Sequence, residues 1–162
     1  MDIKKELADA LKGNVVVVGI GNAMRGDDGF GVALAEGLKG RISASVIITG
    51  STPENHIKTI RDSRPDTILV LDAAELGEKA GSVKLIKKRD IPLYGLSTHN
   101  ASLALFFDFL ESDTKADIFM LAVQTVDSGM KFSLSPVVQK KCEELRALLA
   151  ELLPEAEGGR CQ

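Results

Sequence analysis

The chain has 162 residues, which is enough for one well-buried hydrophobic core and too short for two ordinary domains. Hydrophobic residues make up 44% of the sequence and charged residues 27%, which excludes a wholly disordered chain. The formal net charge of -3 gives no electrostatic basis for binding nucleic acid or a membrane surface. No apolar run is long enough for membrane insertion, and the N-terminus lacks a signal-peptide pattern, so we expect a cytoplasmic protein.

The first half of the chain alternates between helical and strand patterns. Residues 3–11 favour a short helix that Gly13 closes at C′, and the four valines at 15–18 are typical of a strand buried on both faces. A glycine-rich loop then leads into a second helix, and residues 46–48 form the next strand. We expect Thr52 to cap the helix that follows, with Pro53 at its first position.

The second half continues the alternation, with one exception. Residues 67–71 form a buried strand ending at Asp72, and residues 73–81 are too few for a crossover helix. Residues 82–87 are therefore expected as an antiparallel edge strand. A helix, a core strand at 118–123 and a closing helix follow. The pattern predicts a three-layer α/β/α sandwich with a mostly parallel sheet, one domain over residues 1–153 and a disordered tail over residues 154–162.

Several polar residues lie in the segments that follow the strands. In open α/β sheets, ligands bind beyond the carboxyl ends of the strands. The residues expected near that edge are Asn22, Asp27, Asp28, Gly50, Ser51, Asp72, His99, Gln124 and Asp127.

Each of these residues also has an ordinary structural interpretation. An Asp-Asp-Gly loop often serves as a turn, and His99 could bond to the backbone at a helix start. Taken together, however, two carboxylates and one imidazole from three loops suit a divalent transition metal. His56 and Cys142 are expected on the surface and in the core, respectively. The sequence has no HExxH helix, no paired-cysteine zinc motif and no GxSxG elbow.

At this point the motifs resemble a known family. Residues 19–22 (GIGN) and 26–31 (GDDGFG) resemble the N-terminal signature of the [NiFe]-hydrogenase maturation endopeptidases. The likeness continues through residues 50–55, 69–73 and 97–100, and is greatest to the proteases that process hydrogenase 3 large subunits. The resemblance implies an endopeptidase, of aspartic type by family classification. It would recognise nickel in a large-subunit precursor and remove a C-terminal extension.

Carried over by position, the family's metal-contacting and catalytic residues fall on Asp28, Asp72 and His99. The nickel would arrive with the precursor, either to polarise the reacting groups or only to position the scissile bond. Asp28, or Asp27 beside it, would act as the general base. Residues 49–51 (TGS) replace the Asp-Gly-Gly of relatives and Gln124-Thr125 replaces a Gln-Pro, so the substrate groove could differ.

Two other functions are compatible with part of this pattern. A phosphoacceptor receiver domain also places an Asp pair after its first strand and an Asp after its third, where they bind magnesium. It has no need for His99, however, and requires a lysine that residues 124–125 do not supply. A module that binds the precursor without cutting it is the second alternative, since a fold alone does not fix an activity.

Overall fold

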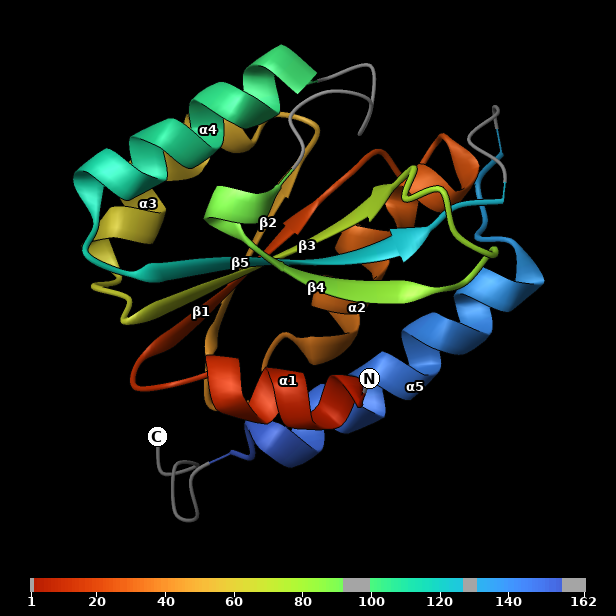
Figure 1. The fold of residues 1–162 in the computed structure, drawn as a ribbon, viewed down its shortest axis with the longest axis horizontal. Helices are drawn as coiled ribbons and strands as arrows, with labels where there is room; N and C mark the ends of the chain where they lie inside the picture. The colour runs from red at the N-terminus through yellow and green to blue at the C-terminus, as the bar shows by residue number, and fades with distance from the viewer. Residues whose placement is uncertain (1, 92–99, 127–130, 156–162) are drawn as a thin grey trace.

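The computed structural model describes residues 2–91, 100–126 and 131–155. Their strands form one five-stranded sheet in the order β2-β1-β3-β5-β4 (Figure 1). The strands are β1 (Val15–Ile20), β2 (Ser45–Gly50), β3 (Thr67–Ala74), β4 (Val83–Lys87) and β5 (Asp117–Gln124). β4 runs antiparallel to β5 at one edge, and the other neighbouring pairs are parallel. The predicted mixed sheet with an antiparallel edge strand is confirmed.

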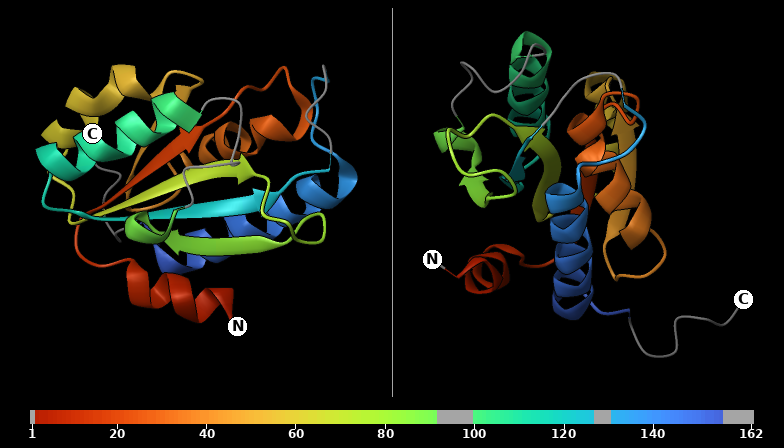
Figure 2. Two further views of the ribbon diagram at one scale, coloured as in Figure 1. Left: turned by 45° about the horizontal axis from the view of Figure 1, so that its top comes forward. Right: turned by 90° about the vertical axis from the view of Figure 1, so that its right-hand side faces the viewer.

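Helices cover both faces of the sheet, which gives the predicted three layers (Figure 2). The α-helices are α1 (Ile3–Ala10), α2 (Phe30–Leu38), α3 (Ile57–Asp62), α4 (Asn100–Asp113) and α5 (Pro136–Leu152). Short 3-10 helices are η1 (Gly26–Gly29), η2 (Pro53–His56) and η3 (Lys88–Asp90). The helices α1, α2 and α5 pack on one face of the sheet, and α3 and α4 pack on the other.

The valine run of β1 shows why the sequence folds in this way. Val15 and Val17 belong to the core under α2 and α5, while Val16 and Val18 belong to the core under α3 and α4. Successive side chains of a strand point to opposite faces, so a strand covered on both sides needs apolar residues at every position. The continuous run is therefore explained by burial on both faces.

Two predicted boundaries, at α1 and β3, were wrong. α1 ends at Ala10, and Gly13 (φ 64°) lies in the turn to β1 instead of at C′, because the backbone is already extended at Leu11. The predicted start at Thr52 and Pro53 is present, since Thr52 is the N-cap and Pro53 the first residue of the 3-10 helix η2, but the Thr52 side chain makes no capping hydrogen bond. β3 continues past Asp72 to Ala74, because these residues pair with β5. Across the described residues, no helix is long and apolar enough to cross a membrane.

Candidate active site at the carboxyl edge of the sheet

The loop after β1 closes on itself and fixes the position of Asp28. The backbone N–H of Asn22 donates to the Asp28 carbonyl oxygen at 3.1 Å and to Asp28 Oδ2 at 3.1 Å. Gly21 has a φ of 144°, and a Cβ at this position would overlap the carbonyl oxygen of Asp28. Only glycine therefore lets the two ends of this loop approach so closely.

A second glycine brings this loop against the neighbouring strand. A Cβ added at Gly31 would overlap the carbonyl oxygens of both Ile20 and Leu71. The first turn of α2 therefore lies directly on the ends of β1 and β3. This close packing brings Asp28, which lies two residues before α2, to the last part of β3, where Asp72 lies.

Asp72 is a buried acid with an acidic neighbour. It alternates along β3 with Val70 and Ala74, which belong to the core under α3 and α4, so its side chain lies on that face. It is 8% exposed, and Ala73 N–H donates to its Oδ1 at 2.8 Å. Burial raises the pKa of Asp72 well above its usual value of 3.8; the charge of Asp28 raises it further, and the Ala73 N–H opposes both effects.

Neither acid is neutralised within the part of the chain that the structure describes. No Lys, Arg or His among the described residues forms an ion pair with Asp28 or Asp72. The two carboxylates therefore form an uncompensated acidic pair at the sheet edge. A cation, or a proton shared with Asp72, would relieve their repulsion.

His99 falls outside the described residues, as does Asp127, so the predicted set of three ligands is not tested by their positions. The structure does place the residue that follows His99. α4 begins at Asn100 and runs toward the amino end of β5, so its first turn lies at the carboxyl edge, on the face that carries Asp72. Among the described residues, no group of three His, Cys, Asp or Glu side chains could hold a metal ion.

Asp27 has a different role from its neighbour. Its side chain is fully buried, and its carboxylate accepts hydrogen bonds from Val126 N–H (2.8 Å), Ser135 N–H (2.7 Å) and Ser135 Oγ–H (2.9 Å). It therefore joins the loop after β1 to the segment before α5. A carboxylate engaged in this way is not free to accept a proton from water, so Asp28 is the better candidate for a general base.

Gln124, also predicted near the edge, holds a loop in place. Its Oε1 accepts hydrogen bonds from Leu76 N–H (2.7 Å) and Glu78 N–H (3.2 Å), and its Nε2 donates to Glu75 Oε1 (2.9 Å). The amide is thus occupied by the connection between β3 and β4. Cys142 is buried in α5, and burial raises the pKa of its thiol, so it does not act as a nucleophile.

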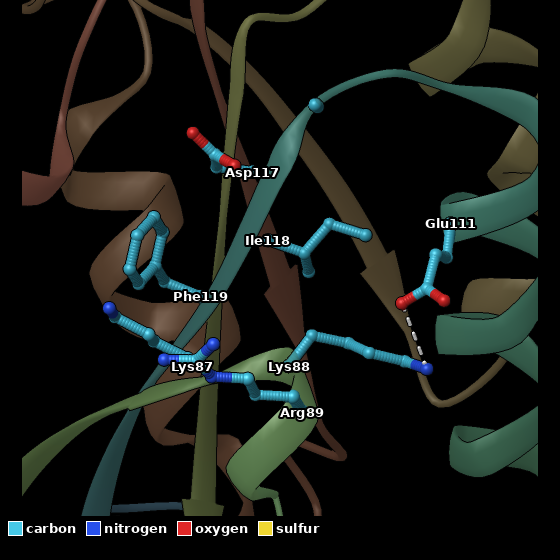
Figure 3. A pocket seen from close by; sticks show the side chains of 8 residues that line it. Lys87, Lys88, Arg89, Glu111, Asp117, Ile118 and Phe119 are labelled. Atoms are coloured by element: carbon cyan, nitrogen blue, oxygen red, sulfur yellow. Dashed lines mark ion pairs between the residues drawn. The ribbon is translucent and has the colours of Figure 1, made fainter.

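A pocket of about 330 Å³ lies at the amino edge of the sheet, where the parallel strands begin (Figure 3). Its lining includes Lys87 at the end of β4, Lys88 and Arg89 in η3, and Asp117 at the start of β5. Lys88 Nζ lies 3.1 Å from Glu111 Oε2 and 3.2 Å from Asp108 Oδ1. This pocket lies at the amino end of the parallel strands, away from Asp28 and Asp72, and is not part of the candidate active site.

Comparisons with known proteins agree with this architecture. Residues 32–151 match the family model described as hydrogenase maturation protease. The chain belongs to the hydrogenase maturation protease family. By this membership it is a peptidase, and the receiver-domain alternative is excluded.

Individual relatives extend the match. The chain is 33% identical to the hydrogenase 3 maturation protease of Escherichia coli K12 over 131 residues, which is 79% of this chain and 83% of the relative. A crystal structure of a [NiFe] hydrogenase maturation protease from Thermococcus kodakarensis is similar with a TM-score of 0.83 and 29% identity, covering 91% of this chain and 98% of the other. A crystal structure of a hydrogenase 3 maturation protease gives a TM-score of 0.74 and 31% identity, covering 92% and 96%.

Proposed function

We propose that this chain removes the C-terminal extension of a [NiFe]-hydrogenase large-subunit precursor after nickel insertion, and that Asp28, Asp72 and His99 bind the precursor's nickel. The observation that carries the proposal is the acidic pair formed by Asp28 and Asp72 at the sheet edge, for which the described residues supply no ion-pair partner. A divalent cation arriving with the substrate would neutralise this pair. Family membership supplies the peptidase activity.

In this proposal the metal belongs to the substrate. A precursor without nickel would leave the acidic pair uncompensated and would bind weakly, whereas a loaded precursor would be held by carboxylate and imidazole ligands. The binding step would thereby select precursors that already contain nickel. We propose that this step takes place in the cytoplasm. The nickel then either polarises the scissile carbonyl or only positions it beside the base.

The chemistry is the addition of water across an amide bond. The water oxygen bonds to the carbonyl carbon while Asp28, which is partly exposed, accepts a proton from that water. The bond from carbon to nitrogen then breaks, and the proton passes to the leaving nitrogen. Asp27 does not take this role, because its carboxylate already accepts three hydrogen bonds.

Mass spectrometry of a nickel-loaded precursor mixed with the protein tests the proposal. The wild-type chain should lower the precursor mass by that of the extension, and His99→Ala should leave it unchanged while retaining the circular dichroism spectrum of the wild type. His56→Ala is the matched control, since His56 is the other histidine of the chain and is not a proposed ligand, and it should cleave as the wild type does.

Two results would contradict the proposal in different ways. A precursor left intact by the wild-type chain would mean that the protein binds precursors without cutting them. Full cleavage by His99→Ala would remove His99 from the site while leaving the peptidase activity in place.

A further inference from the structure

We propose that an apolar surface formed by Met24, Val126 and Phe132, together with the pocket beside it, binds an apolar segment of the precursor next to its cleavage site. We call these three residues the apolar rim. The proposal rests on the proposed function, because the precursor is taken to be the substrate.

The apolar rim consists of side chains that the fold leaves in solvent. Phe132 is 80% exposed, Val126 55% and Met24 51%, and Phe132 is the most exposed large apolar side chain among the described residues. Aromatic and large apolar residues gathered on a surface mark sites that bind proteins, because water is displaced from them on contact.

Hydrogen bonds hold the segments of the rim together. Gly26 N–H donates to the Lys131 carbonyl at 2.8 Å, and Val126 N–H donates to Asp27 Oδ2 at 2.8 Å. Val126 is itself one of the bonded residues. Met24 lies two positions before Gly26, and Phe132 directly follows Lys131. The three side chains therefore come from backbone segments that are fastened to one another.

A pocket of about 320 Å³ lies among the same segments. Its lining is made by Gly26, Val126, Lys131, Ser133, Leu134, Ser135 and Pro136. Such a volume is at the lower end of the range for small-molecule sites. It suits one or two side chains of a peptide whose neighbouring residues lie across the rim.

The position of the rim indicates which molecule binds to it. Asp28, a proposed nickel ligand, follows Asp27 directly, and Asp27 binds both Val126 and Ser135. Asp27 thus ties the loop that carries Asp28 to the segments that carry the rim, and a substrate whose nickel is held at Asp28 would bring its nearby residues toward these segments. The proposed substrate is a polypeptide, so an apolar stretch of the precursor is the occupant that fits this continuity.

A pair of double variants tests this inference with nickel-loaded precursor. Val126→Ser with Phe132→Ser removes two rim side chains and retains the Val126 backbone N–H that binds Asp27. Leu105→Ser with Phe109→Ser is the matched control, since both are exposed apolar residues of α4, on the other face of the sheet. We expect the rim variant to raise KM about 10-fold or more with kcat changed less than about 2-fold, as for loss of substrate contacts, while the control matches the wild type.

The outcomes separate this inference from the proposed function. If the wild-type chain does not cleave the precursor, the proposed function fails. If the wild-type chain cleaves it and the rim variant has an unchanged KM, only the inference is overturned. Sedimentation of the isolated chain supplies a further check: a dimer that the rim variant converts to a monomer with unaltered cleavage would assign the rim to self-association and would overturn the inference.

Discussion

The two edges of the sheet differ in how they neutralise charge. At the amino edge, Lys88 lies between Asp108 and Glu111. Both carboxylates raise the pKa of the Lys88 ammonium group, and Glu111 has the larger effect. At the carboxyl edge, Asp72 is buried beside Asp28, and the described residues offer neither acid an ion-pair partner. At the amino edge the charges neutralise one another within the chain. At the carboxyl edge the two acids require a cation or a proton from outside the described residues. Groups with strongly shifted pKa values occur more often at functional sites. The lack of charge neutralisation around Asp72 therefore marks the carboxyl edge as the candidate active site and the amino edge as structural.

The largest effect is expected from Asp72→Asn, which removes one member of the acidic pair at nearly constant volume. Loss of a proposed nickel ligand should lower kcat/KM for cleavage by about 10³-fold or more. Residual cleavage within about 10-fold of the wild type would contradict a role for Asp72 in binding the substrate metal. The rate should be measured with nickel-loaded precursor under single-turnover conditions.

The same variant should be more stable than the wild-type protein in the absence of metal. The pKa of Asp72 is raised in the folded state, so the folded state binds this proton more tightly and loses stability as the pH rises above 3.8 through the folded-state pKa. Asp72→Asn abolishes that loss, and its melting temperature should exceed that of the wild type increasingly over this window, by about 2–4 °C for each kcal/mol recovered. Thermal unfolding with a chelator, followed from pH 4 to pH 8, is the measurement; equal melting temperatures throughout would show that the pair is compensated.

A second comparison concerns the adjacent acids Asp27 and Asp28. Asp27→Asn places an amide N–H₂ among hydrogen-bond donors in a fully buried site, and should cost about 2–4 kcal/mol of unfolding free energy. Asp28→Asn retains an oxygen that can accept from Asn22 N–H and should cost less than about 1 kcal/mol, yet cleavage should be lost. Urea unfolding of both variants measures the difference. Equal losses of stability would remove the distinction between a structural and a reacting carboxylate.

The smallest effect is expected at the amino edge. Lys88→Met removes an ammonium group whose two carboxylate partners are largely exposed, and should cost about 0.2–1 kcal/mol because solvent screens such pairs. Cleavage of the precursor should be unchanged. A marked fall in the cleavage rate of this variant would show that the amino-edge pocket contributes to cleavage. It would contradict the distinction between an active carboxyl edge and a structural amino edge.

Much of the fold could be predicted from local patterns. The valines at 15–18 indicate a strand covered on both faces, and the shortness of residues 73–81 indicates an antiparallel turn back to β4; both features are present. The end of β3 could not be predicted, because Asp72 to Ala74 are held in the strand by β5, about fifty residues away in sequence. Non-local pairing of this kind leaves no local pattern.

The candidate site could be predicted in part. Position after a strand selected Asp28, which lies after β1, and Asp72, which instead lies within the last part of β3, close enough for the charge of Asp28 to raise its pKa. The same rule grouped Asp27 and Gln124 with them, although both side chains are engaged in holding loops. Two adjacent aspartates look equivalent in sequence, and only the contact with Ser135, 108 positions later, assigns Asp27 to the framework. The role of His99 stays a prediction.

The hydrogen bonds of Asp27 also bear on which parts of the chain must be present before the acidic site can form. The loop that carries Asp28 is fastened by Val126 and Ser135, which follow Asp27 by 99 and 108 positions in the chain. A nascent chain, or a fragment that stops before Ser135, therefore lacks the contacts that tie this loop to the rest of the fold. Chains that lack Ser135 would accordingly be without the ordered acidic site on which the proposed cleavage depends.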